Sequence, residues 1–233
     1  MTFQASVNYD FGFGIPGEIV RAGPQRAKIG MINSASALNN VFGRAFTRNV
    51  GTNTVGAGGT GVYYGILANP KEHASGGLAG APLSPNFALN NLTQAAFAEM
   101  SLICVALVGT AKQGDTVNFN QADGTLSALT SLATFTASQA AGVLTVSAIS
   151  GGNLGIGSVV TLANGTAVGT ITSLGSGTGG VGTYNLNTSA TVASQAMVAT
   201  SVIPAGFTQV PRAYIDRFDQ NTAGGLALLN ITN

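Results

Sequence analysis

Charged residues are scarce in this chain, and one long stretch has none. Only 7% of the residues are charged, against roughly a quarter in an average soluble domain. From Gly124 to Pro211, more than a third of the 233 residues, there is no Lys, Arg, Asp, Glu or His. Such a stretch cannot supply an ordinary general acid or base, a carboxylate or imidazole metal site, or a cationic clamp for phosphate. These absences exclude most enzyme classes from that part of the chain.

Cysteine, histidine and tryptophan are almost absent as well, with one, one and no residues respectively. The single cysteine, Cys104, excludes an internal disulfide framework and cysteine-rich zinc sites. Because it lies in the apolar run from Leu102 to Val108, we expect a buried strand residue and not a nucleophile. His73 has no second histidine and no serine-elbow motif to work with, so we expect it in a loop. The sequence therefore predicts no catalytic residue, no cofactor and no metal site.

Long apolar runs are also missing, which bears on where the protein works. A membrane helix needs about 18 or more consecutive apolar residues, and the best candidate is the short run 102–108. The N-terminus lacks the basic start and apolar run of a signal peptide, so we expect synthesis in a cytoplasm. A composition that is 45% hydrophobic with a formal charge of +1 predicts a folded chain. This balanced charge also argues against a nucleic-acid surface.

What the neutral stretch does contain is a repeated β pattern. Short β-branched runs alternate with period two, and each ends at Gly, Asn or Ser, a spacing typical of an antiparallel barrel or sandwich. Ser and Thr occupy the outward positions. Two G-x-G-x-x-G stretches, 56–61 and 177–182, precede strand-like segments and not helices, so we expect turns or loops there and no dinucleotide site. The strands expected in this region are 133–137, 143–149, 158–162, 167–174, 182–186 and 192–198.

The charged remainder of the chain is also predicted to be mostly β structure. We expect a hairpin in residues 17–32 around Gly23-Pro24, strands at 41–47, 62–68, 210–219 and 225–232, and one short helix at 94–101. The sequence thus predicts an all-β fold with an antiparallel β-sandwich or barrel-like host domain, residues 1–123 plus 202–233. An inserted small, charge-free β domain, residues 124–201, interrupts it. The alternative is two consecutive domains with a C-terminal tail, whose two strands would then lack partners.

Several segments of the host region resemble the structural cement, or head decoration, proteins of tailed bacteriophages. They keep their order along the chain: residues 14–19 (GIPGEI), with Gly23-Pro24 and Arg26; 40–46 (NVFGRAF); 65–72 (GILANPKE); and 224–229 (GGLALL). The segment 179–186 (GGVGTYNL) is similar to small β modules of virion surface and tail proteins. The resemblance implies a non-enzymatic protein on the outer surface of an assembled capsid, made in the bacterial cytoplasm, that bridges major capsid protein subunits.

Under this resemblance, the aromatic N-terminus and the arginines become candidate interface residues. Aromatic side chains and arginines are enriched at interface hot spots. We expect the host domain to bind the major capsid protein and the neutral module to project outward, with a homo-oligomer, provisionally a trimer, as the unit. The N-terminal aromatics could instead belong to an ordinary first strand. The predicted capsid-interface residues are Tyr9, Phe11, Phe13, Arg21, Arg26, Arg44 and Arg48.

A second hypothesis is a surface adhesin or carbohydrate-binding β module, suggested by the hydroxyl-rich neutral surface. Aromatic platforms commonly stack on sugars, and only Tyr184, Phe135 and Phe207 are available in or beside the neutral stretch. The lack of tryptophan weakens this hypothesis.

Overall fold

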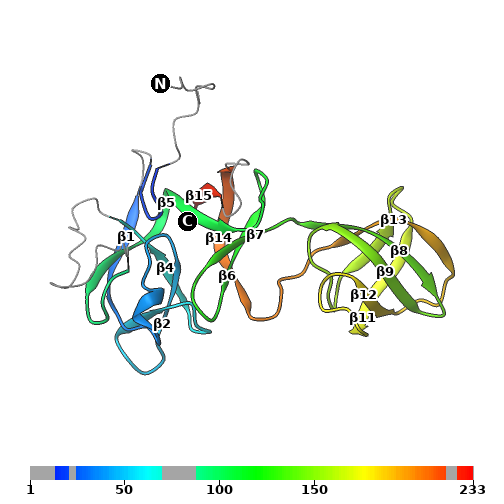
Figure 1. The fold of residues 1–233 in the computed structure, drawn as a ribbon, viewed down its shortest axis with the longest axis horizontal. Coiled ribbons are helices and arrows are strands. Elements are labelled where there is room, and N and C mark those ends of the chain that lie inside the picture. The colour runs from blue at the N-terminus through cyan, green and yellow to red at the C-terminus, as the bar shows by residue number, and fades with distance from the viewer. Residues whose placement is uncertain (1–13, 21–24, 70–87, 219–224, 233) are drawn as a thin grey trace, which may run out of the picture.

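The computed structural model describes residues 14–20, 25–69, 88–218 and 225–232, and these residues form an almost entirely β protein (Figure 1). The only helical element among them is a single 3-10 turn, η1 (Ala37–Asn39). The predicted all-β class is therefore confirmed. The strands form a nine-stranded mixed sheet and a separate six-stranded closed barrel.

The nine-stranded sheet closes on itself twice around its longest strand, β5 (Gln94–Val108). The first closed set, which we call ring 1, runs β1-β3-β2-β4-β5, and β5 pairs back onto β1. The second, ring 2, runs β5-β15-β14-β6-β7, and β7 pairs back onto β5. Ring 1 contains β1 (Arg26–Ile32), β2 (Ala45–Arg48), β3 (Thr54–Ala57) and β4 (Tyr63–Leu67). Ring 2 contains β6 (Thr116–Asn120), β7 (Leu126–Leu129), β14 (Phe207–Phe218) and β15 (Leu226–Ile231).

Strand β5 serves both rings because its two halves have different partners. Residues 94–100 pair with β1, whereas residues 101–106 pair with β15. The predicted helix at 94–101 is therefore wrong. Ala, Glu and Met favour helix locally, but Ala95, Phe97 and Ala98 are buried in this strand, and tertiary pairing overrides a weak propensity. The host sheet is also not wholly antiparallel, since β1–β3 and β5–β7 are parallel pairs.

The barrel strands match the sequence prediction closely, because the alternation that predicts them also builds the barrel core. Strand order is β10-β11-β12-β9-β8-β13, and all the pairs are antiparallel. The interior residues, which include Leu144, Val160 and Ile171, form a hydrophobic cluster of their own. The strands are β8 (Leu132–Ala140), β9 (Val143–Gly151), β10 (Val159–Leu162), β11 (Ala167–Leu174), β12 (Gly182–Leu186) and β13 (Val192–Thr200).

The chain enters and leaves the barrel at adjacent points. Leu132 pairs with Thr200 across β8 and β13, and the Ser201 N–H donates to the Ser131 carbonyl at 3.0 Å. Strand β7, although it lies in the neutral stretch, pairs with β5 and β6 of ring 2. In Figure 1 the barrel lies at one end of the molecule and ring 1 at the other, with ring 2 between them.

Candidate functional site

Four of the seven predicted interface residues lie outside the described residues. These are Tyr9, Phe11, Phe13 and Arg21, and the same holds for His73. The other three, Arg26, Arg44 and Arg48, are on or next to strands of ring 1. They have different surroundings, and only one of them faces an open hollow.

Arg44 is held by contacts within the chain. Its guanidinium donates to the Asn39 side-chain carbonyl at 3.3 Å and to the Asp123 main-chain carbonyl at 3.2 Å. It also lies 3.8 Å from the Asp123 carboxylate. These contacts join the start of β2 to the turn between β6 and β7, so this arginine connects ring 1 to ring 2.

Arg26 and Lys28 share one carboxylate on the neighbouring strand. Arg26 Nε lies 2.7 Å from one oxygen of Glu99, and Lys28 Nζ pairs with the other. The hydrogen bond from Lys28 and the positive charges of both side chains lower the pKa of Glu99. Glu99 thus holds both cations of β1 against strand β5.

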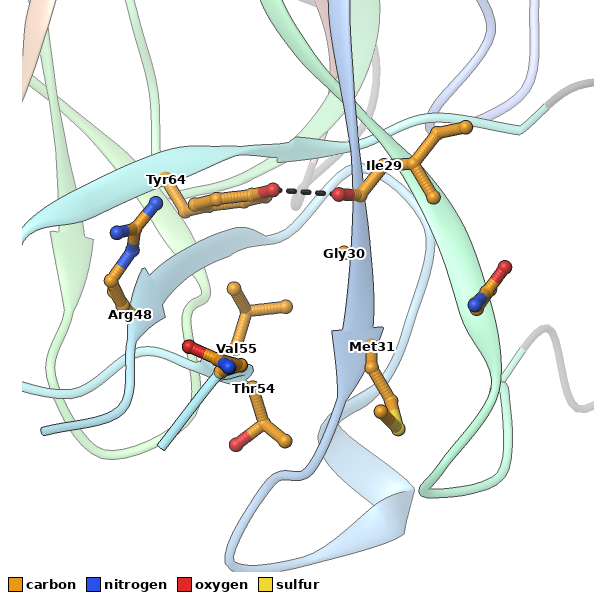
Figure 2. Close-up of a pocket in the computed structure, with 9 residues that line it drawn as sticks. Ile29, Gly30, Met31, Arg48, Thr54, Val55 and Tyr64 are labelled. Atoms are coloured by element: carbon orange, nitrogen blue, oxygen red, sulfur yellow. Dashed lines mark hydrogen bonds between the residues drawn. The ribbon is translucent and has the colours of Figure 1, made fainter. Parts of the chain in front are cut away.

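Arg48 lines two shallow hollows on ring 1, and Figure 2 shows the first of them. The hollows have volumes of about 330 and 380 Å³ and share Arg48 and Asn53. The Arg48 guanidinium carbon lies 5.6 Å from the centroid of the Tyr64 ring, within cation–π distance. Among the described residues, its guanidinium has neither a carboxylate nor a hydrogen-bond acceptor. Arg48 is therefore a positive charge that the described chain leaves uncompensated.

The Tyr64 side chain lines the first hollow and is held in place by contacts of its hydroxyl and of its ring. Its hydroxyl donates to the Ile29 carbonyl at 2.7 Å, as Figure 2 shows, and its ring meets Phe97 edge-on with centroids 5.3 Å apart. A Cβ on Gly30 would lie 3.0 Å from the Tyr64 ring, so glycine lets this ring approach β1. The hollow thus has a rigid floor.

Exposed apolar side chains surround these hollows. Ile29 and Met31 line the first, and Val50 and Val62 line the second. Among the described residues, the five most exposed large apolar side chains are Val50, Val62, Ile29, Leu38 and Leu92, at 70–93%. All five lie between β1 and the start of β5. The most exposed apolar side chains therefore belong to ring 1, although the barrel also exposes some, such as Ile156 and Val181, and exposed apolar surface is typical of an interaction site.

The segments that carry the family resemblance meet at the junction of the two rings. The Gly17 N–H donates to the Cys104 carbonyl at 2.7 Å, and the Gly43 N–H donates to the Leu67 carbonyl at 2.8 Å. Gly17 has a φ of +88°, and a Cβ there would lie 2.8 Å from the Phe42 Cβ. Positive φ and close packing both require glycine at this position. The resembling residues are thus explained by packing, and the exposed hollow residues are not among them.

The described residues offer little for catalysis or for sugar stacking. They contain no group of three or more metal-ligating side chains, and no helix in them has the length and apolar character to cross a membrane. Residues 58–61 of the first glycine stretch lie in the β3–β4 connection and residues 177–181 of the second in the β11–β12 connection, as predicted, whereas Gly56 and Ala57 end β3 and Gly182 begins β12. Tyr184 and Phe135 are buried in the barrel core, so neither presents a flat face to a sugar.

The comparison with known families decides the identity. The family described as structural cement protein (E217 gp24/Pam3 gp6) matches residues 3–156, about two thirds of the chain. The chain belongs to this structural cement protein family. The match continues through β9 and ends before β10, so it covers ring 1, strands β6 and β7 of ring 2, and strands β8 and β9 of the barrel. A comparison with curated proteins gave no match.

Membership of the cement family establishes a structural role in the virion, in association with the capsid. The resemblance inferred from the host segments is therefore confirmed. Sequence reasoning picked out Arg48 by residue type, but it missed Tyr64, Val50, Val62 and Leu92. Local sequence contains no signal for these residues, because their importance depends on where ring closure places them.

Proposed function

We propose that this protein is a non-enzymatic cement protein that binds the outer surface of the capsid and bridges neighbouring major capsid protein subunits. The observation that carries the proposal is the family match over residues 3–156. The highly exposed apolar residues of ring 1 and the charge of Arg48, which has no carboxylate partner among the described residues, support it, since a binding face needs both contact area and complementarity. Repetition on a lattice adds avidity, so each single contact can be weak.

We further propose a two-part organisation in which ring 1 and ring 2 form the capsid-binding host and the barrel projects outward. Adjacent entry and exit points at Ser131 and Ser201 support an insertion. A separate barrel core supports it too. Because β7 pairs within ring 2, the inserted module would consist of residues 132–200 and not the whole of 124–201. The position of ring 1 opposite the barrel supports this orientation (Figure 1).

The predicted interface residues remain proposals of unequal support. Arg48 has the strongest case, because its charge is unpaired among the described residues and lies at a hollow. Arg44 has the weakest, because Asn39 and Asp123 hold it. Tyr9, Phe11 and Phe13 would act as apolar anchors of an N-terminal arm, with Arg21 and Arg26 as polar partners of the interface. A trimer remains the proposed oligomer.

Reconstitution on particles tests the proposal. Particles assembled without this protein would be mixed with the purified full chain, and quantitative mass spectrometry would give copies bound per major capsid protein. We expect saturable binding at a stoichiometric ratio and greater resistance of the particles to heat. Absence of saturable binding would refute the cement role. A reconstruction with the barrel against the shell would refute the orientation, and full occupancy after deletion of residues 1–13 would refute the arm.

A further inference from the structure

Leu92 combines two features that are costly for the isolated chain. It has a φ of +67°, a left-handed conformation that is unfavourable for a bulky side chain. Its side chain is also 70% exposed, so packing within the described chain returns little of that cost. Backbone strain of this kind often marks a functional position.

The position of Leu92 links it to the hollows on ring 1. Its N–H donates to the Ile32 carbonyl at the end of β1, at 2.6 Å. The next residue on β1, Met31, pairs with Gln94 of β5, and both line the first hollow. Leu92 is therefore held against the end of β1, next to residues that line the hollow, and Arg48 provides the charge in that hollow.

From this arrangement, we infer that Leu92 and the hollow form a docking site for an extended segment of the major capsid protein that carries a carboxylate between apolar residues. Ile29, Met31, Val50 and Val62 would contact the apolar side chains of that segment, and Arg48 would pair with the carboxylate. We call these five residues, together with Leu92, the ring 1 docking surface. The inference rests on the proposed cement function.

Charge complementarity favours this occupant. Among the described residues that line the two hollows, Arg48 is the only charged one, and none is a carboxylate. A partner segment with one carboxylate would compensate Arg48, whose planar guanidinium suits bidentate pairing. The floor is held by Tyr64 and needs little ordering on binding, which lowers the entropic cost of association.

The sharpest test separates stability from binding at Leu92. Asparagine tolerates the left-handed region, so Leu92→Asn should relieve the backbone strain at this position. We expect the melting temperature to rise by roughly 2–4 °C. The same substitution should weaken binding to particles assembled without this protein by at least tenfold. Arg212 is the matched control, because it also has a positive φ, +51°, and is exposed, but it lies on β14 of ring 2. Arg212→Asn should also melt higher and should bind like the unmodified protein.

Two further pairs of variants test the chemistry of the surface. Val50→Asp should reduce binding, whereas Val181→Asp, at an exposed valine in the β11–β12 connection of the barrel, should not. Arg48→Glu should reduce binding more than Lys112→Glu, a charge reversal on ring 2. Thermal unfolding of each variant shows that it is folded.

The possible outcomes are distinct. If unmodified protein binds particles and Leu92→Asn and Arg48→Glu bind equally well, the docking surface is refuted while the cement function stands. If the unmodified protein does not bind the particles, both the docking surface and the cement function are refuted. If sedimentation velocity without particles shows that these variants break up an oligomer, the occupant is a second copy and the inference is overturned.

Discussion

Three tyrosine hydroxyls in this protein have different surroundings, and this predicts a ranked effect for one substitution. Tyr184 is fully buried in the barrel; its hydroxyl donates to the Gly180 carbonyl at 2.7 Å and accepts from the Gly179 N–H at 3.0 Å. The Tyr63 hydroxyl is buried and has no hydrogen-bond partner among the described residues. Tyr214 is 39% exposed and accepts from Asn230 Nδ2 at 2.8 Å.

Replacement of Tyr184 by phenylalanine should be the most destabilising of the three. It leaves the buried Gly179 N–H without an acceptor, which costs about 1–3 kcal/mol. The Gly180 carbonyl is only half-buried, so water can replace its bond at smaller cost. Tyr214→Phe should change stability by less than about 0.5 kcal/mol, because water replaces an exposed contact. Tyr63→Phe removes a buried unpaired hydroxyl and should be neutral or stabilising by up to about 1 kcal/mol.

Urea unfolding followed by circular dichroism would measure the three variants against the unmodified chain. Amide hydrogen exchange at Gly179 would show whether the loss at Tyr184 is local, since protection there should fall while protection in β5 stays unchanged. Equal losses for Tyr184→Phe and Tyr214→Phe would refute the assigned role of the barrel hydroxyl. A clear destabilisation by Tyr63→Phe would mean that its hydroxyl has a partner, and the reasoning from burial would fail there.

Three further predictions follow from the backbone and the titrating groups. Ala141 and Gly142 both have positive φ in the β8–β9 turn, as in a type I′ turn, so Ala141→Asn should stabilise the protein by about 0.5–1 kcal/mol in thermal unfolding; an unchanged melting temperature would contradict this. The lowered pKa of Glu99 contributes stability that is lost as pH falls below about 4.5; Glu99→Gln should flatten the acid limb of the stability curve, by less than about 1 kcal/mol because Arg26 and Lys28 are 47% and 41% exposed and solvent screens the pairs. Burial raises the pKa of Cys104 to about 11 from 9.0, so stability should fall as pH rises through this window. Labelling of Cys104 by a thiol reagent at pH 8 should be as slow as the opening of the strand. Rapid labelling of the folded protein would refute the burial of this thiol.

The accuracy of the sequence predictions varied with how local the responsible interactions are. The barrel strands followed from alternation in short segments such as 143–149, because each inward residue there meets the same core. The helix predicted at residues 94–101 was wrong, because pairing with β1 holds these helix-forming residues in strand β5. The parallel β1–β3 and β5–β7 pairs had no local signal at all, since register between distant segments is set by ring closure.

For the candidate site, residue type was predictable and position was not. Arg44 and Arg48 are four residues apart and looked equivalent in the sequence, yet one binds Asp123 and the other borders a hollow. Leu92 gave no signal, because a left-handed φ and an exposed side chain are properties of the folded turn and not of the letters Asn-Leu-Thr.

The sequence alone determined the class of this protein: its composition left the neutral stretch without charged or imidazole side chains, its alternation predicted β structure, and the ordered host segments indicated the cement family. These properties depend on residue types and short-range periodicity. Only the tertiary structure decided that β5 closes two rings, that β7 belongs to the host sheet, and that apolar and positive residues far apart in the chain share one surface. The reason is physical, since ring closure joins segments whose separation along the chain contains no information about their distance in space.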